Sequence, residues 1–292
     1  MADAVTGNST DHSVSLRRGL LAAPALLLVV LFIAAPYLSI VVMSVRSPSN
    51  LQVYGPGFTL QSYIRILGDR LYLGLLADTL IYAAVTAAVC LVLAYPTALH
   101  LARTRSRFRG LLYGALLSPL LTGVVIRCFG WIVLLASQGL VNDSLRAIGI
   151  GPVQFLYKPV GVIIAMVHVF LPFMVLPIIN AIESIDPRLE EAASTLGASR
   201  MAVFRHVILP LSMPGVQSGV TLVFVLAASA YVIPMLLGGG RVQTMATVVV
   251  QQLLGGFLWP FGAALALVLS LAVVLVLVVF ALATGRAMRR LS

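Results

Sequence analysis

Residues 191–210 read EAASTLGASRMAVFRHVILP and are the most polar interruption in the second half of an otherwise apolar chain. Asp186 and Pro187 precede them and predict a helix start, because the aspartate accepts hydrogen bonds from free amide groups and the first helical position needs no N–H. A spacing of i, i+3, i+4 and i+7 places one apolar stripe on this helix, formed by Leu189, Ala192, Ala193 and Leu196. Gly197 then stands where a helix ends in a left-handed residue.

A second short helix is predicted directly after this turn. Ser199 is suited to cap it, and its apolar positions are Met201, Phe204 and Val207. Pro210 is expected to end it before the next apolar run, since proline lacks the N–H that a helix interior uses. The segment is therefore predicted to be an amphipathic helix–turn–helix between two long apolar runs.

The composition excludes an ordinary soluble protein. Of the 292 residues, 60% are hydrophobic and 10% are charged, which is more apolar surface than one water-soluble core could bury. Several uncharged runs exceed the ~20 residues that cross ~30 Å of hydrocarbon. We therefore predict an all-α fold, a polytopic bundle of membrane helices.

Six transmembrane helices are predicted within a membrane domain at 19–285. Their approximate ranges are 19–45, 73–101, 110–136, 159–182, 211–236 and 258–283. The remaining parts are cytoplasmic tails at 1–18 and 286–292 and a cytoplasmic loop at 184–210. The start of the first span superficially resembles a secretory or twin-arginine signal. Its apolar run is longer than the ~7–15 residues of such a signal and no clear cleavage site follows, so we expect an uncleaved span.

The basic residues set the expected orientation. With the N-terminus in the cytoplasm, the dense clusters fall on the cytoplasmic side, at Arg17, Arg18, Arg103, Arg105, Arg107, Arg109, Arg188, Arg200, Arg205, Arg286, Arg289 and Arg290. The opposite side holds fewer, at Arg46, Arg65, Arg70, Arg146, Lys158 and Arg241. This bias predicts that both termini are cytoplasmic. It also explains the net charge of +10 without a nucleic-acid partner. The cluster at 103–109 is interpreted as topogenic, with some contact to lipid head groups.

No pattern in the chain supports catalysis or cofactor binding. The single lysine, Lys158, follows no glycine-rich loop of the kind that cradles phosphates. The four histidines lack metal-ligand spacing, and Cys90 and Cys128 lie in apolar runs, as buried thiols do. We predict no catalytic residue, no metal and no cofactor here, so any energy from ATP must come through another chain.

Arg127 is the most unusual single residue, because a cation inside a span costs several kcal/mol unless it faces a cavity or a partner. A spacing of four places Gly123, Arg127 and Trp131 on one helical face. The arginine either lines a pathway or subunit contact, or it snorkels to the interface beside the tryptophan. His168, in the fourth span, is interpreted as a hydrogen-bond partner of a neighbouring helix in preference to a proton relay.

Six positions of the polar segment resemble the E-A-A…G…I-x-L-P loop of permease subunits of binding-protein-dependent ABC importers, type I. They are Glu191, Ala192, Ala193, Gly197, Leu209 and Pro210, with Val207 where isoleucine is usual. The resemblance implies a MetI-like permease fold in a bacterial inner membrane. It implies that this loop couples the chain to a separate ATPase dimer, which binds the ATP. It further implies an external solute-binding protein and a second permease, homologous or identical, as partners.

Two further stretches resemble the spermidine/putrescine permease group, most closely the first of its two permeases. The first stretch contains Pro119, Ile126, Arg127, Trp131, Leu134, Gly139 and Asn142. The second contains Tyr231, Val232, Ile233, Pro234, Leu237, Gly238, Gly239, Gly240, Arg241 and Met245. The resemblance favours a polyamine, but related permeases carry opines, amino-acid derivatives and phosphonates.

The residues themselves leave the solute open. Aromatic side chains suited to amines are available, including Trp131 and Tyr231. Asp78 is the only acid within a predicted span and is either a ligand or an interfacial cap, while Arg127 suits an anionic or zwitterionic solute. Residues 238–240 are either a gate hinge or a plain flexible turn. An ion-coupled secondary transporter is disfavoured, since the spans lack the carboxylates expected for ion coupling. A membrane scaffold is disfavoured because it leaves the docking loop without a role.

Overall fold

The computed structural model describes residues 28–49, 52–104 and 106–289, which form helices and no named strand. The predicted all-α fold is confirmed. A first helix spans Leu28–Ser44. The elements that follow are α2 (Gln61–Gly68), α3 (Arg70–Arg103), α4 (Arg109–Leu121), α5 (Val124–Leu135), α6 (Leu140–Ala147), α7 (Pro159–Glu183), α8 (Pro187–Thr195), α9 (Arg200–Val203), the π-helix η1 (Phe204–Ile208), α10 (Leu209–Ala228), α11 (Val232–Gly238), α12 (Met245–Val250), the π-helix η2 (Gln251–Gly255) and α13 (Trp259–Arg289).

Five helices within the described residues are long and apolar enough to cross a membrane. They are Arg70–Arg103, Val124–Ala147, Pro159–Glu183, Arg200–Ala228 and Trp259–Arg286. The first predicted span is described only from Leu28, and the predicted tail at 1–18 lies outside the described residues. At the other end α13 continues to Arg289, so the helix enters the predicted tail at 286–292.

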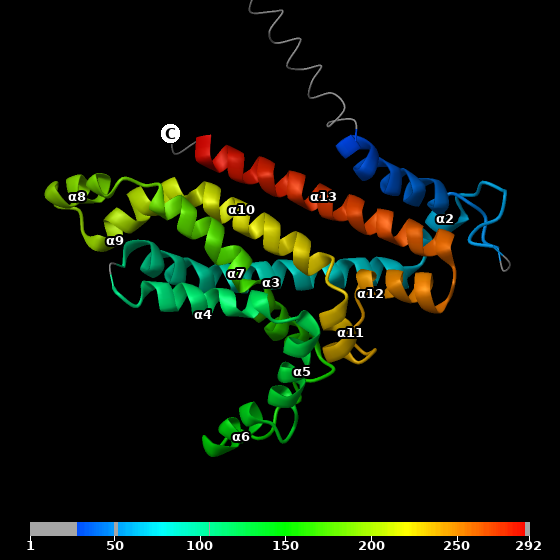
Figure 1. Ribbon diagram of the computed structural model, residues 1–292, viewed down its shortest axis with the longest axis horizontal. Helices are drawn as coiled ribbons and strands as arrows, with labels where there is room; N and C mark the ends of the chain where they lie inside the picture. Colours follow the sequence, from blue (N-terminus) through cyan, green and yellow to red (C-terminus); the bar gives the residue numbers. More distant parts are fainter. Residues whose placement is uncertain (1–27, 50–51, 105, 290–292) are drawn as a thin grey trace, which may run out of the picture.

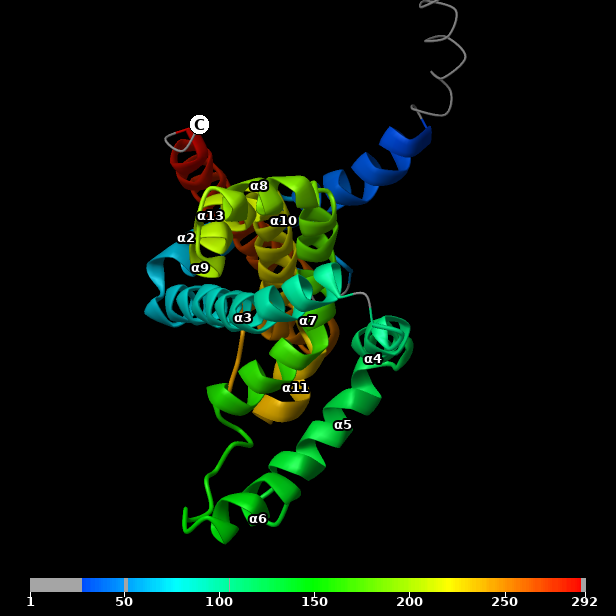
Figure 2. The same ribbon diagram turned by 90° about the vertical axis from the view of Figure 1, so that its left-hand side faces the viewer.

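The centre of the bundle is α7, which packs against both α3 and α10 (Figures 1 and 2). Along α3, which packs against α7, the buried residues between 83 and 98 are small, namely Ala83, Thr86, Ala87, Cys90, Ala94 and Ala98. Their size lets the two backbones approach closely, as is usual where lipid provides no hydrophobic driving force. The Cys90 thiol reaches the Val167 carbonyl oxygen at 3.6 Å, and Phe170 of α7 is buried in the same core.

The contact between α10 and α7 depends on two glycines four residues apart. A Cβ at Gly215 would lie 2.5 Å from the Pro177 carbonyl oxygen, and one at Gly219 would lie 2.8 Å from the Met174 sulfur. Glycine at this spacing gives a flat helix face on which a second backbone can rest. The pair therefore fixes how close α10 comes to the central helix.

Two predicted spans are interrupted. The range 110–136 divides at Thr122 and Gly123, which are extended, and α5 with α6 leaves the bundle as a separate arm (Figure 2). Pro119 lacks the N–H that would bond to Ala115, and the Ser118 hydroxyl donates to that carbonyl instead, at 3.0 Å. The range 211–236 divides between α10 and α11, at 229–231.

Pro210 does not end the second short helix, so this prediction is wrong. α9, η1 and α10 follow one another without a break from Arg200 to Ala228, with Pro210 in the first turn of α10. The π-helix supplies the reason, because the Leu209 N–H bonds to the Phe204 carbonyl five residues back. This wider turn accommodates a proline ring that a regular α-helix would force against the preceding turn.

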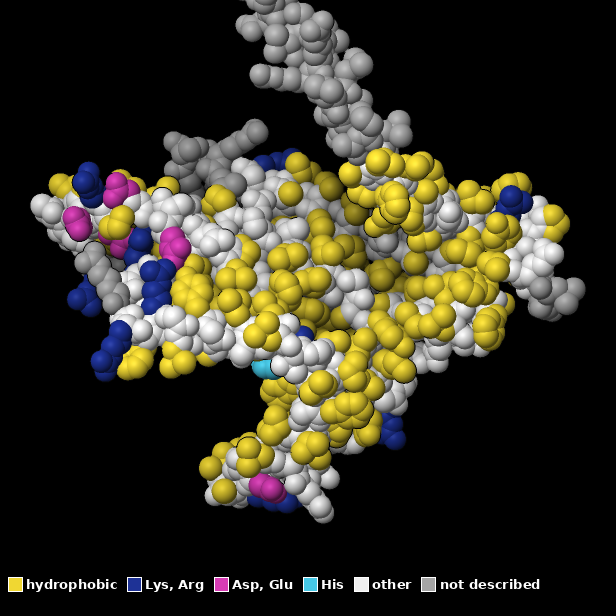
Figure 3. Space-filling view, in the orientation of Figure 1, with side chains coloured by type: hydrophobic (Ala, Val, Ile, Leu, Met, Phe, Trp, Pro, Cys, Tyr) yellow, Lys and Arg dark blue, Asp and Glu magenta, His cyan; other side chains and the backbone are white. Residues whose placement is uncertain are grey.

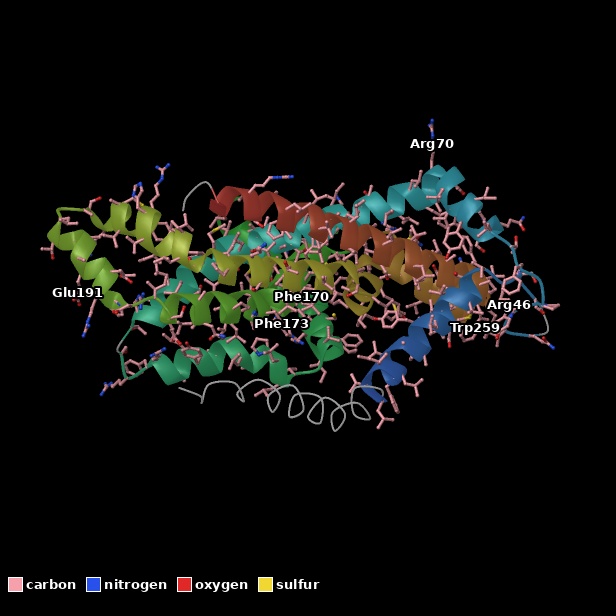
Figure 4. All side chains as sticks on the ribbon, turned by 90° about the horizontal axis from the view of Figure 1, so that it is seen from above. Arg46, Arg70, Phe170, Phe173, Glu191 and Trp259 are labelled. Carbon is pink, nitrogen blue, oxygen red and sulfur yellow. The ribbon has the colours of Figure 1, made fainter. Side chains whose placement is uncertain are left out.

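Charge separates the two ends of the molecule from its middle. Figure 3 shows Lys, Arg, Asp and Glu side chains gathered around α8, with hydrophobic side chains over the central part. In Figure 4, Glu191 lies at this end, Phe170 and Phe173 lie midway on α7, and Arg46, Arg70 and Trp259 lie at the opposite end. The polar helix pair thus lies at one end of an apolar bundle.

Candidate functional site

The helix pair at the charged end has the local geometry that its residues predict. The Asp186 carboxylate accepts from the Arg188 N–H at 2.9 Å, with Pro187 in the first turn of α8. Gly197 has a φ of +86°, and the Ser199 hydroxyl accepts from the Ala202 N–H at 3.3 Å. These caps satisfy amide groups that a short helix leaves free.

The apolar side chains of this pair have little to cover them within the chain. Leu196 is 89% exposed, Met201 is 71% exposed and Leu189 is 49% exposed. Glu191 is also exposed, and its carboxylate makes no hydrogen bond or ion pair with the described residues. Exposed apolar residues among polar ones mark surfaces that a partner covers.

Two ion pairs lie at this end of the bundle, and the first of them holds the helix pair to α3. Arg103, at the end of α3, lies 2.6 Å from Glu190 of α8 and also donates to the Ile185 carbonyl at 3.3 Å. Arg109, at the start of α4, pairs with Glu183 at the end of α7, which also accepts from the Tyr113 hydroxyl at 3.2 Å. The arginine cluster at 103–109 therefore has a structural contact that its sequence did not indicate.

A third attachment joins η1 and α10 to α3 by aromatic packing. The ring of Tyr95 meets that of Phe204 edge to face, with centroids 5.6 Å apart. The Tyr95 hydroxyl lies 2.7 Å from the Ser212 hydroxyl. Because Tyr95 contacts residues on both sides of Leu209 and Pro210, it attaches this part of the segment to α3.

Arg127 and Trp131 both lie on α5, one helical turn apart, as their spacing predicts. The Trp131 Nε1–H donates to His168 Nδ1 on α7 at 3.2 Å, and the two rings meet edge to face. The predicted hydrogen bond between His168 and a neighbouring helix is thereby confirmed. The Nε and Nη1 atoms of Arg127 are buried and have no hydrogen-bond partner among the described residues.

Tyr231 lies at the interruption between α10 and α11 and lines a pocket of about 350 Å³. Its lining also includes Pro234, Met235, Gln243 and Gln251. The pocket is mostly apolar, with two amide side chains that offer both donors and acceptors. Tyr231 is therefore placed at a cavity, away from the pair formed by Arg127 and Trp131.

The three glycines at 238–240 form the end of α11 and a tight turn. Gly238 is buried as the last helical residue, while Gly239 and Gly240 have φ values of +52° and +78°. A Cβ at Gly239 would lie 2.3 Å from the ring of Tyr157, so only glycine fits there. These residues therefore form a tight glycine turn, and their role as a gate hinge stays a prediction.

Asp78 lies in the N-terminal half of α3 and borders a different pocket, which also contains Gly240. The described residues contain no group of three His, Cys, Asp or Glu side chains that could hold a metal ion, and the thiols of Cys90 and Cys128 are free and buried.

The fold and its exposed helix pair define a class of protein, a multi-pass membrane subunit that offers a docking element at one end. A family model described as binding-protein-dependent transport system inner membrane component matches residues 15–291. The chain belongs to this family. It is a permease subunit of an ABC importer in the inner membrane, and not an enzyme.

Relatives and solved structures agree with this assignment. The chain is 36% identical over 253 residues to the spermidine/putrescine transport system permease protein PotB of Escherichia coli (strain K12), which covers 86% of this chain and 92% of that protein. It is 33% identical over 173 residues to the molybdenum transport system permease protein ModB of Azotobacter vinelandii, covering 59% and 76% of the two chains.

A bacterial ABC transporter that imports the acidic polysaccharide alginate has a chain of similar fold, with a TM-score of 0.71, 19% identity and coverage of 96% and 97%. The MetNI methionine ABC transporter has a chain with a TM-score of 0.54 and 17% identity, covering 75% of this chain and 95% of that one. At these identities the likeness concerns the fold alone, and it supports the MetI-like bundle expected from the sequence.

Proposed function

We propose that this permease forms part of the import pathway for a polyamine such as spermidine or putrescine. The similarity to spermidine/putrescine permeases, which extends over 86% of the chain, supports this solute class. An external binding protein delivers the solute, and a second homologous or identical permease completes the pathway. ATP binds to a separate ATPase dimer, and this chain itself carries no cofactor.

The observation that carries the coupling part of this proposal is the exposed apolar face at one end of the bundle. Leu196 and Met201 are 89% and 71% exposed on a segment that is otherwise capped and tied to α3. A rigid segment with uncovered apolar residues can transmit force from a partner that covers it. We infer that Glu191, Ala192, Ala193, Gly197, Leu209 and Pro210 couple the ATPase to the spans.

We infer that both termini lie in the cytoplasm, with the loop at 184–210 facing the ATPase. The uneven distribution of arginines supports that orientation, since the dense clusters are predicted on the side of this loop and fewer on the opposite side. Arg46 lies 4.2 Å from the ring centroid of Phe58, and Arg65 lies 4.9 Å from that of Phe261. Aromatic rings therefore accommodate two of the cations on the opposite side.

Co-purification tests the coupling role. The ATPase should co-purify with the unaltered permease and be lost with Glu191→Lys or Gly197→Asp, because the first reverses an exposed charge and the second strains a left-handed turn. Arg107→Gln is the matched control, an exposed arginine near the same end that makes no ion pair with the described residues. Retention of the ATPase by both variants would refute the proposed contact. Cysteine labelling at Ala193 from outside intact cells would refute the orientation.

A second solute class has one specific observation in its favour. The buried Nε and Nη1 atoms of Arg127 lack partners within the described residues, and such donors suit a carboxylate or phosphonate. We propose Arg127, Trp131, Tyr231 and Asp78 as pathway or subunit-contact residues in either case. A thermal-shift screen of the cognate binding protein decides between the classes. A shift with polyamines supports the first, and a shift with opines, amino acids or phosphonates alone supports the second.

A further inference from the structure

A second pocket, of about 370 Å³, opens beside the N-terminal half of α3. Its polar lining comes from three segments far apart in sequence: Asp78 and Tyr82 on α3, Tyr157 before α7, and Gly240, Arg241 and Gln243 after α11. The residues Gly240 and Gln243 also line the pocket of Tyr231. The two pockets therefore adjoin across the turn that follows α11.

Asp78 and Glu191 are the two acids in the described part of the chain whose carboxylates have no partner there, and Glu191 lies on the polar helix pair at the other end of the bundle. The other five carboxylates of that part are engaged, either as helix caps or in ion pairs, namely Asp69, Asp143, Glu183, Asp186 and Glu190. The Asp78 carboxylate has no hydrogen bond or ion pair with any described residue and lies one helical turn from Tyr82. An unengaged anion thus faces a pocket within a predicted membrane span, where charge is costly unless it serves a partner.

Tyr157 adds a second, independent observation. Its φ is +62°, a conformation that costs a non-glycine residue on the order of 1–3 kcal/mol. The conformation is held on both sides, because the Tyr157 N–H donates to the Leu237 carbonyl at 2.9 Å and the ring lies against Gly239. Tyr157 thereby contributes to the lining of the same pocket as Asp78 and Tyr82. Backbone strain of this kind concentrates at ligand sites.

A carboxylate and two phenol rings that line one pocket have the chemistry that recognises an ammonium group. The carboxylate supplies charge-assisted hydrogen bonds, and the ring faces attract a cation. Arg241 borders the same pocket and is exposed, with no ion pair to Asp78. The positive charge of Arg241 repels an ammonium group, so we expect the pocket to bind it weakly. Weak binding suits a solute that must pass on to the next pocket.

We propose that Asp78, with the rings of Tyr82 and Tyr157, forms an external subsite for one ammonium group of the transported solute. The inference rests on the proposed function as a polyamine importer. The solute enters this subsite when the binding protein releases it. It then passes the turn at Gly240 into the pocket of Tyr231.

Uptake by the assembled importer, with its binding protein and ATPase in proteoliposomes, tests the subsite with putrescine as the probe. Asp78→Asn keeps the shape and removes the charge, so putrescine uptake should fall about tenfold, as expected for losing a hydrogen bond to a charged group. Asp143→Asn is the matched control, an acid on the α6 arm, and should leave uptake unchanged. Arg241→Gln should raise uptake, because it removes the opposing charge. Unchanged uptake with Asp78→Asn would overturn the inference.

Ring substitutions keep the test decisive if the Asp78 variant fails to assemble. Tyr82→Phe retains the aromatic face and should keep uptake, whereas Tyr82→Leu should lose it severalfold. Equal uptake by these two variants would overturn the proposal. An unaltered importer that takes up γ-aminobutyrate and no putrescine would instead refute the polyamine function. Failure of the subsite alone appears as normal putrescine uptake in every variant.

Discussion

Removing the charge of Glu190 tests whether the ion pair with Arg103 holds the coupling helix in place. The two charged atoms lie 2.6 Å apart and each side chain is 25% exposed. At that distance and an effective dielectric constant of about 20, the Coulomb attraction is about 6 kcal/mol. Desolvation of two largely covered groups offsets most of it. The Glu190 oxygen also lacks hydrogen-bond geometry. Fully exposed ion pairs contribute about 0.2–1 kcal/mol to stability. Because this pair is more covered than those, we expect it to contribute about 1–2 kcal/mol.

The expected result is weaker docking of the ATPase. If this ion pair holds α8 in the orientation that the ATPase binds, α8 is less ordered in Glu190→Gln. Part of the binding free energy must then be used to fix its orientation. Since about 1.4 kcal/mol is tenfold in affinity, the ATPase should bind the purified permease pair about 5–30-fold more weakly. The number of solute molecules carried per ATP should fall as well. The substitution removes no positive charge, so the orientation signals of the chain stay intact.

A double-mutant cycle separates the pair from its surroundings. Arg103→Gln, Glu190→Gln and the double variant should give an interaction energy of about 1–2 kcal/mol, and the exchanged pair Arg103→Glu with Glu190→Arg should recover part of the affinity. Arg107→Gln is again the control, because it lies in the same loop without an acidic partner. Strictly additive effects, or wild-type affinity in Glu190→Gln, would refute the holding role.

Three further outcomes are expected. Gly215→Leu should destabilise the purified complex by at least about 1–3 kcal/mol in thermal unfolding, since its Cβ meets a backbone oxygen at 2.5 Å. Gly74→Leu, with nothing within 4 Å, should be neutral, and equal melting temperatures would contradict the packing argument. Asn142→Ala removes a buried side-chain amide that makes three hydrogen bonds. The local stability of the α6 arm should fall by about 1–3 kcal/mol, so its backbone amide hydrogens should exchange faster. Unchanged exchange would contradict this. Gly239→Ala should lower transport, because this position combines a positive φ with a Cβ contact at 2.3 Å. Gly151→Ala, which has neither feature, should leave transport unchanged. Equal uptake by the two variants would argue against a constrained turn.

Local chemistry could be predicted from sequence with good accuracy. The caps at Asp186 and Ser199 and the left-handed Gly197 involve groups at most four residues apart, so their hydrogen bonds depend only on neighbouring residues. The membrane-length runs follow from composition in the same way. The end assigned to Pro210 was wrong because a π-helix, which no simple residue pattern announces, accommodates the proline.

Features made by distant residues could not be predicted. The split at Thr122 and Gly123 required knowing that α5 leaves the bundle, since the 110–136 run is uncharged throughout except for Arg127. The sequence predicted that Arg103 sets the membrane orientation. Its hydrogen bond to the Ile185 carbonyl shows that it also attaches α3 to the segment before α8. No property of the arginine in the sequence distinguishes these two roles.

The chain's own sequence determined that it crosses a membrane many times and that a capped polar helix pair interrupts its apolar runs, because burial in lipid and helix capping act on short stretches. The tertiary structure decided what that pair is attached to and which side chains share a pocket. Asp78 and Tyr157 are separated in sequence by the rest of α3 and by α4, α5 and α6, and they border one cavity only because α3 packs along α7. Contacts of this kind depend on how closely two helix backbones approach each other. Small residues at the helix contacts allow a close approach, but no single small residue specifies which helices pack together.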